Sequence, residues 1–106
     1  MGDDAVILEG VEGEESAGAL YSTVHGAGRL FSRRKAKETF TRTEMDAWVR
    51  QKGVHLVGGD LDESPMAYRR LGEVLAAHAN TVRIVHTLKP FLVVMAGKEV
   101  RDPYKD

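Results

Sequence analysis

Short apolar runs alternate with polar and glycine-rich segments along most of the chain. Residues 4–9 (DAVILE), 19–24 (ALYSTV) and 54–58 (VHLVG) have the length and the β-branched or aromatic content of strands. The β-rich stretch 81–97 is interrupted by Pro90, which has no N–H to donate to a ladder, so it predicts two strands. The acidic, glycine-rich segment between the first two strands (GVEGEESAG) predicts a loop.

Three further segments have helical patterns. A helix is expected to start soon after Leu30 and to include the basic run RRKAKETF. A second follows Thr43, with apolar residues at helical spacing, and ends at Gly53. A third is expected from an N-cap at Ser64, with proline at the first helical position, through to His78. About three helices with mixed or antiparallel strands predict an α+β fold, whose core would include Trp48, Leu71, Val74 and Leu75.

Composition is that of one globular domain or a piece of one. The chain has 106 residues, of which 42% are hydrophobic and 29% are charged. Its longest apolar run, 91–96, is too short to span a bilayer, and its N-terminal residues do not form a secretory leader. It has no cysteine, so disulfides and thiolate metal sites are excluded. We expect a cytoplasmic protein with no membrane partner.

Charge is unevenly distributed although the net charge is only −1. Acidic residues gather near the N-terminus and in the segment GDLDES, and basic residues gather within nine positions of one another. Such a cluster is compatible with phosphate binding, and it is equally typical of a solvated helix face. The basic cluster consists of Arg29, Arg33, Arg34, Lys35 and Lys37.

The segment HGAGR, residues 25–29, is the strongest candidate for chemistry. Glycines allow backbone N–H groups to approach an anion, and Arg29 offers a planar fork of donors. His25 could act as an acid, a base, a metal ligand or a nucleophile. No Gly-Lys-Ser/Thr follows, and Phe31 occupies the place of the last glycine of a dinucleotide-binding fingerprint, so neither of those two phosphate-binding motifs is present.

The stretch 21–36 (YSTVHGAGRLFSRRKA) closely resembles the segment around the nucleophilic histidine of the RtcB family of RNA-splicing ligases. Two further stretches agree in order. Residues 62–90 resemble that family's Pro-x-Ala-Tyr-Lys/Arg helix and Leu-Lys/Arg-Pro strand, and 89–99 resemble a variant of its closing strand. The match is strongest over 19–97. It implies that residues 1–106 are a single domain or fragment from the C-terminal quarter of a larger RtcB-like fold, with 98–106 as a polar tail.

The resemblance implies a reaction and a set of site residues. Ligases of this family join RNA 2′,3′-cyclic-phosphate or 3′-phosphate ends to 5′-hydroxyl ends, using GTP and Mn²⁺. Mapped onto this chain, His25 attacks GTP and carries GMP covalently. The nucleotide would lie against the backbone of Gly26, Ala27 and Gly28. Arg29 would contact a phosphate or the RNA, and Tyr68 would pack near the guanine.

The sequence departs from the family pattern at two points. Met95 stands where the family has a lysine that reads the guanine, which leaves Lys98, three residues on, as the candidate replacement. The manganese ligands of the family belong to its N-terminal part, so we assign no metal ligand in this chain. The other three histidines lie in apolar strand or helix patterns and are interpreted as structural: His55, His78 and His86.

Three functions therefore remain open. The chain could be the nucleophile-bearing part of an RNA ligase for tRNA splicing or RNA repair, with RNA, GTP and the N-terminal remainder as its partners. It could instead be a non-catalytic module that binds RNA or a nucleotide on its basic surface. The third alternative is a structural fragment that assembles with a separate N-terminal chain.

Overall fold

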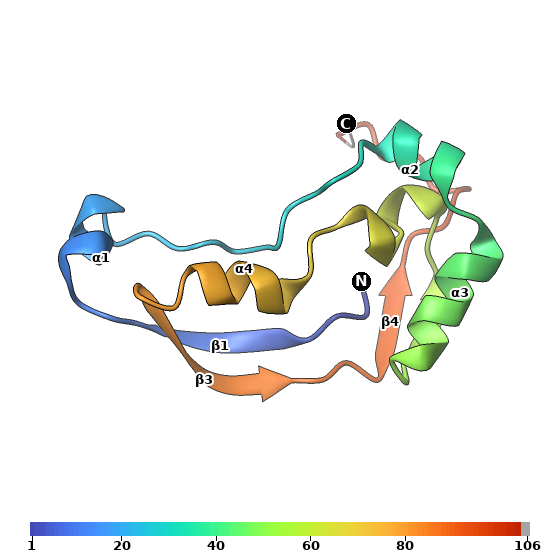
Figure 1. The fold of residues 1–106 in the computed structure, drawn as a ribbon. Helices are drawn as coiled ribbons and strands as arrows, with labels where there is room; N and C mark the ends of the chain where they lie inside the picture. Colours follow the sequence, from blue (N-terminus) through green and yellow to red (C-terminus); the bar gives the residue numbers. More distant parts are fainter. Residues whose placement is uncertain (105–106) are drawn as a thin grey trace.

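The computed structural model describes residues 1–104 and has the expected α+β class (Figure 1). In these residues four α-helices and two short 3-10 helices accompany two small sheets. The elements in chain order are β1 (Ala5–Gly10), α1 (Glu14–Gly18), α2 (Arg33–Thr39), α3 (Arg42–Gln51), β2 (His55–Gly58), η1 (Leu61–Glu63), η2 (Pro65–Ala67), α4 (Leu71–Ala77), β3 (Val82–Leu88) and β4 (Leu92–Met95).

Each sheet has two strands. β1 and β3 pair antiparallel, with a register shift between Ile7 and Leu8, and they form the long ribbon beside α4 in Figure 1. β2 and β4 pair in parallel, with His55 opposite Leu92, at the end of the molecule that also carries α3. The strands expected at 4–9 and 54–58 and on both sides of Pro90 are therefore confirmed.

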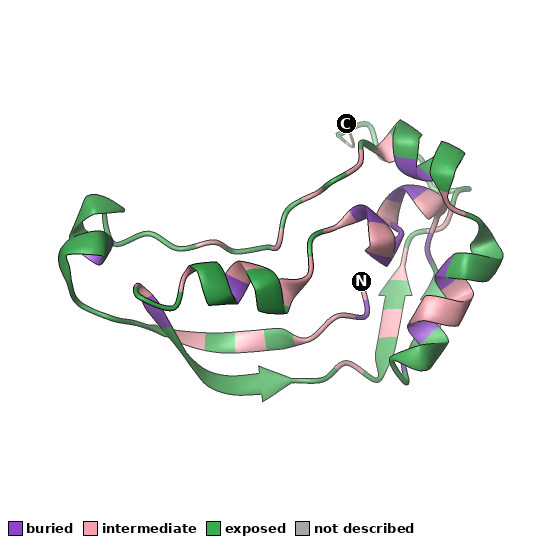
Figure 2. Cartoon of the chain, in the orientation of Figure 1, coloured by how far each residue is buried: buried purple, intermediate pink, exposed green. Residues whose placement is uncertain are grey.

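Buried side chains gather around α2, α3 and the two 3-10 helices (Figure 2). Met45 and Val49 form the inner face of α3, and Ala36 of α2 and Ala67 of η2 are fully buried near them. Of the apolar residues predicted in the core, Leu75 is buried, whereas Trp48, Leu71 and Val74 are half-buried. The ribbon of β1 and β3 contributes little to this core, since Val82 is the one buried residue of these two strands.

Much apolar surface on the strands is open to solvent. In β3, Ile84 and Leu88 are about half exposed, and in β4, Val94 is 70% exposed. Two histidines interpreted as structural, His55 and His86, also have exposed side chains, so in this chain they are not core residues. The accessible surface is 7616 Å²; a compact monomer of 11.7 kDa has about 5,900 Å². Within the described residues no helix is long and apolar enough to cross a membrane.

Helix α3 begins at Arg42, two residues earlier than the expected helix that follows Thr43, because Thr41 forms a capping box. The Thr41 side chain accepts a hydrogen bond from the backbone N–H of Glu44, and the Glu44 side chain accepts one from the N–H of Thr41. Two N–H groups that the first helical turn leaves unpaired are thereby satisfied. At the other end, Gly53 follows the helix with φ +73, as expected of its stop position.

The capping box leads to a prediction about stability. Thr41→Ala is expected to lower the free energy of unfolding by about 1 kcal/mol, because the N-cap oxygen is lost. Urea denaturation followed by circular dichroism measures this change. Thr43→Ala is the matched control: Thr43 is exposed inside the helix, and its change to alanine should be neutral or slightly stabilising. Equal destabilisation by both variants would contradict the assignment of Thr41 as the cap.

The prediction of a strand at residues 19–24 is wrong. The segment GVEGEESAG instead contains α1, whose first turn carries Glu14 and Glu15 where acidic side chains favour a helix. Leu20 and Tyr21 then adopt positive φ angles of 57° and 54°, and the Tyr21 N–H donates to the Ser16 carbonyl at 2.8 Å. This turn ends α1, and no strand within the described residues lies beside 19–24 to pair with it.

The prediction of a single helix from Ser64 to His78 is also wrong. The chain forms η2, then runs extended at Tyr68 (φ −116, ψ 153), and begins α4 at Leu71. The Ser64 hydroxyl donates to the Leu61 carbonyl rather than capping η2. The N–H of Leu71 donates to the side chain of Asp3 at 3.2 Å, so α4 receives its cap from a residue distant in sequence. The break at Tyr68 is what brings this segment to HGAGR.

Candidate functional site

His25 lies on an exposed segment that connects α1 to α2. This segment runs along α4 (Figure 1). His25 itself lies in a bend, and its side chain is exposed. A cavity of about 480 Å³ opens beside it, within the size range of small-molecule sites. The cavity is bounded by the start of β1, by the start of α4 and by the histidine segment, and its lining includes His25, Gly26, Ala27, Tyr68 and Arg69.

The two glycines of HGAGR have different structural roles. A Cβ atom at Gly26 would meet nothing within 4 Å, so the backbone next to His25 is open to an incoming group. Gly28 has φ +88, which other residues rarely adopt, and a Cβ atom there would lie 3.0 Å from Nη1 of Arg69. Gly26 therefore leaves room for a ligand, while Gly28 is required by the turn and by a neighbouring side chain.

Backbone hydrogen bonds join HGAGR to the Ala-Tyr-Arg element. The N–H of Leu30 donates to the carbonyl of Ala67 at 2.8 Å, and the N–H of Arg69 donates to the carbonyl of Gly28 at 2.9 Å. Arg29 and Tyr68 thereby form an isolated antiparallel bridge. The structure thus brings together His25 and Tyr68, which are 43 residues apart in the sequence, at one cavity.

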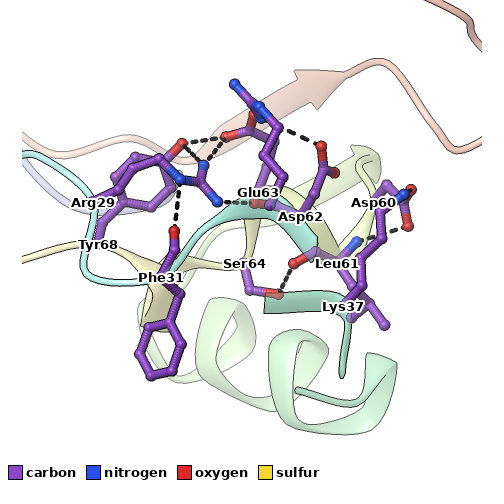
Figure 3. Close-up of polar contacts among 10 residues, drawn as sticks. Arg29, Phe31, Lys37, Asp60, Leu61, Asp62, Glu63, Ser64 and Tyr68 are labelled. Atoms are coloured by element: carbon purple, nitrogen blue, oxygen red, sulfur yellow. Dashed lines mark hydrogen bonds and ion pairs between the residues drawn. The ribbon is translucent and has the colours of Figure 1, made fainter. Parts of the chain in front are cut away.

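The guanidinium of Arg29 faces Phe31, Asp62 and Tyr68 (Figure 3), and Arg29 is not among the residues that line the His25 cavity. Its Nε donates to the Phe31 carbonyl at 3.0 Å, its Nη1 donates to the Tyr68 hydroxyl at 2.7 Å, and its Nη2 donates to the Asp62 carbonyl. Its Cζ also lies 4.7 Å from the centre of the Tyr68 ring. The phosphate or RNA contact expected of Arg29 stays a prediction, but each nitrogen of this guanidinium already donates within the chain.

Glu63 is the carboxylate at the centre of this network. It accepts hydrogen bonds from the Tyr68 hydroxyl and from Nη1 of Arg33, and it lies 3.4 Å from Nη1 of Arg29. The side chain of Glu63 is 14% exposed, and the two arginines are about a quarter exposed, so the charges attract one another in a partly desolvated setting. We call the set of Arg29, Arg33, Glu63 and Tyr68 the arginine clamp.

Lys98 lies at a second, more open cavity rather than with His25. That cavity also includes Arg33, Arg34 and Lys37 of the basic cluster. Arg34 pairs with Glu38 at 2.9 Å, and Lys37 pairs with Asp60 at 3.0 Å. The hydrogen bond to Asp60 raises the pKa of Lys37. Because these cations already face carboxylates, the basic cluster is largely neutralised within the chain; the role of Lys98 in reading guanine stays a prediction.

The residues of the described chain do not fit a manganese site. Among residues 1–104, no group of three or more histidine, aspartate or glutamate side chains lies close enough together to hold a metal ion. Two carboxylates line the His25 cavity, Asp3 and Asp4, and Asp3 accepts a hydrogen bond from the Leu71 N–H. Asp62 and Glu63 face arginines of the clamp. No metal chemistry is therefore assigned to this chain's own residues.

The sequence patterns did not single out Glu63 or Arg69. Glu63 was visible only as one of several acids in GDLDES, and Arg69 only as the basic residue of Ala-Tyr-Arg. The useful signal was the presence of both an acidic cluster and a basic cluster, which predicts that the two partly neutralise each other. Which arginine meets which carboxylate depends on the bridge between Arg29 and Tyr68.

Comparison with known proteins identifies the family. The family model described as tRNA-splicing ligase RtcB matches residues 1–96. The RNA-splicing ligase RtcB of Escherichia coli K12 is 34% identical over 94 residues, which are 89% of this chain and 22% of that protein. The RNA-splicing ligase RtcB of Mycobacterium tuberculosis is 35% identical over 81 residues, covering 73% of this chain and 18% of that protein.

An archaeal relative agrees with these two bacterial ones. The tRNA-splicing ligase RtcB of Aeropyrum pernix is 33% identical over 96 residues, which are 85% of this chain and 20% of that protein. The chain spans about a fifth of the length of the curated relatives it matches. The resemblance inferred from HGAGR and Ala-Tyr-Arg is thereby confirmed, and the chain belongs to the RtcB family of RNA-splicing ligases.

Proposed function

We propose that this chain is the nucleophile-bearing part of a GTP- and manganese-dependent RNA ligase, with His25 as the residue that carries GMP. The observation that supports this most strongly is the position of His25: it is exposed at the edge of a cavity that also holds Gly26, Ala27 and Tyr68. The cavity is mostly apolar, and a tyrosine ring, two arginines and two aspartates also line it. The ring and the arginines suit a purine nucleotide with its phosphates. Its relatives are named RNA-splicing ligases.

The proposed reaction has three bond exchanges. A ring nitrogen of neutral His25 attacks the α-phosphorus of GTP, so that a P–N bond forms and pyrophosphate leaves. An oxygen of an RNA 3′-phosphate then attacks the same phosphorus, the P–N bond breaks, and GMP is carried on the RNA end. Finally, the 5′-hydroxyl of a second RNA attacks the RNA phosphorus, and GMP leaves as the new phosphodiester forms. A 2′,3′-cyclic phosphate must first be opened by water to a 3′-phosphate.

The proposal assigns the remaining groups as follows. Gly26 and Ala27 give the nucleotide access to the backbone, and the Tyr68 ring, which lines the same cavity, packs against the nucleotide. Manganese is held by residues outside this chain. The cellular role would be tRNA splicing or RNA repair in the cytoplasm, and the complete lack of cysteine suits a reducing compartment.

The proposal also includes a partner, the remainder of an RtcB-type ligase. The accessible surface exceeds that of a compact monomer by roughly 1,700 Å², more than one partner contributes to a standard interface. Apolar side chains are exposed on β3 and β4, including Ile84, Leu88 and Val94. A neighbouring part of the ligase that covers these strands would bury this surface and complete the site around His25.

One labelling experiment tests the proposed function. The chain is incubated with α-labelled GTP and Mn²⁺ in two forms: alone, and built into the Escherichia coli relative in place of the region it matches. We expect an acid-labile, base-stable label on the chimaera and little or none on the chain alone, because residues 1–104 hold no cluster of metal-ligating side chains. A folded chimaera without label would contradict the ligase proposal and favour a non-catalytic binding module. Label on the chain alone would contradict the need for the remainder.

A further inference from the structure

Arg69 is the cation of the His25 cavity that the chain itself leaves most available. It lies between η2 and α4, its side chain is exposed, and it lines the same cavity as His25 and Gly26. Its backbone N–H is fixed by the Gly28 carbonyl at 2.9 Å. Its Nη1 lies 3.0 Å from the place that a Cβ atom of Gly28 would occupy, so the guanidinium rests over the glycine turn.

Two arginines line the cavity, of which Arg69 is exposed and Arg70 is half-buried. Arg29 and Arg70 each donate hydrogen bonds of 3.0 Å or less within the chain, and Arg69 does not. All three nitrogens of the Arg29 guanidinium donate hydrogen bonds within the chain. Arg70 donates to the Pro65 carbonyl at 2.8 Å and stacks on Trp48, with its Cζ 4.8 Å from the ring centre. Arg69 makes one long hydrogen bond, 3.5 Å from its Nη1 to the Arg29 carbonyl, and no carboxylate within residues 1–104 pairs with it.

We propose that Arg69, rather than Arg29, binds the phosphate group that lies beside His25. A guanidinium presents two parallel N–H donors that match two phosphate oxygens, and its charge is permanent. Because Gly28 has no side chain, the Arg69 guanidinium can lie directly against the turn that carries His25. The inference deepens the proposed function and rests on it for the kind of ligand; the phosphate belongs either to GTP or to the RNA 3′-end.

The test measures binding by the chain of residues 1–106, without any catalytic step. Arginine Nε–Hε signals of the ¹⁵N-labelled chain are followed by NMR during titration with GTP and, separately, with a trinucleotide bearing a 3′-phosphate. We expect the Arg69 signal to shift and the Arg29 signal to stay. Arg69→Gln should weaken binding about tenfold, since a charged hydrogen bond is lost. Arg69→Lys should recover part of the affinity, because it keeps the charge without the fork.

The matched control is Arg34→Gln. Arg34 is 90% exposed on α2, lies outside the His25 cavity and pairs with Glu38, so its loss should leave the affinity unchanged. A shift confined to GTP or to the RNA end identifies the source of the phosphate. A shift of Arg29 alone, equal affinity of Arg69→Gln and the unchanged chain, or the absence of saturable binding would each overturn the inference.

This outcome is separable from that of the proposed function. If the chimaera takes up a GMP label while Arg69→Gln binds phosphate as well as the unchanged chain, the ligase proposal stands and the role of Arg69 fails. If binding depends on Arg69 but the chimaera takes up no label, Arg69 keeps its assignment as a phosphate ligand and the ligase proposal fails.

Discussion

Replacing His25 with alanine is expected to abolish the covalent GMP label in the chimaeric ligase. No other group at the cavity is proposed to attack the α-phosphorus, so removal of the imidazole should reduce labelling and RNA joining to background. The measurement is acid-labile, base-stable radioactivity retained on the protein after denaturing electrophoresis. Label that persists in the His25→Ala protein at the level of the unchanged protein would contradict the assignment of the nucleophile.

Loss of label by this variant can be separated from loss of structure. The His25 side chain is exposed in an irregular segment, so its truncation should change the free energy of unfolding by less than about 0.5 kcal/mol. His78→Gln is the matched control, since His78 is at the C-terminal end of α4 and outside the cavity. This control should keep the label. Labelling lost equally in both variants would show that the effect is not specific to His25.

The parts of the fold that follow from local pattern were predictable. Met45 and Val49 lie on one face of α3 at helical spacing, and they are buried as that spacing predicts. The strands on both sides of Pro90 also follow from local chemistry, because proline cannot donate to a ladder. The position of the α3 cap was missed by two residues, since Thr41 and Thr43 are equally suitable by type and only the position of Glu44 distinguishes them.

The parts that depend on distant residues were not predictable from pattern. Tyr68 lies in a sequence with helical propensity, yet its extended backbone pairs with Arg29, which a local window does not include. Leu71 receives its cap from Asp3, 68 residues away. At 19–24 the β-branched and aromatic residues suit a strand, but a strand also needs a neighbour, and the left-handed turn at Leu20 leaves it none within the described residues.

The predicted site residues do not all lie together. His25, Gly26, Ala27 and Tyr68 line one cavity, whereas Gly28, Arg29 and Lys98 do not, and the role of each toward a nucleotide stays a prediction. The sequence does not show that Arg29 turns inward, because both an inward and an outward arginine are compatible with HGAGR. That choice depends on Glu63, which is 34 residues from Arg29 in the sequence. Its carboxylate lies 3.4 Å from Arg29 and accepts a hydrogen bond from the Tyr68 hydroxyl.

Glu63→Ala is therefore expected to lower the free energy of unfolding more than the loss of an exposed carboxylate does. It removes the acceptor of the Tyr68 hydroxyl and the carboxylate that Arg29 and Arg33 share, so that Arg29 loses its carboxylate while Arg33 still pairs with Asp62 at 3.3 Å. Breaking such a pair costs about 3 kcal/mol, the low end of the range because the guanidinium groups are about a quarter exposed. Urea denaturation should show a lower midpoint with an unchanged slope.

Two controls decide how this cost arises. Glu38→Ala removes an exposed carboxylate that pairs with Arg34 on one helix, so it should cost at most about 0.5 kcal/mol. Tyr68→Phe removes only the hydroxyl from the clamp and should cost about 1 kcal/mol. If Glu63→Ala costs no more than Glu38→Ala, the arginine clamp does not stabilise the bridge between Arg29 and Tyr68. If it costs the expected amount, amide protection at Leu30 and Arg69 should fall with it, because those N–H groups are bonded across the same bridge and hold the turn that presents His25.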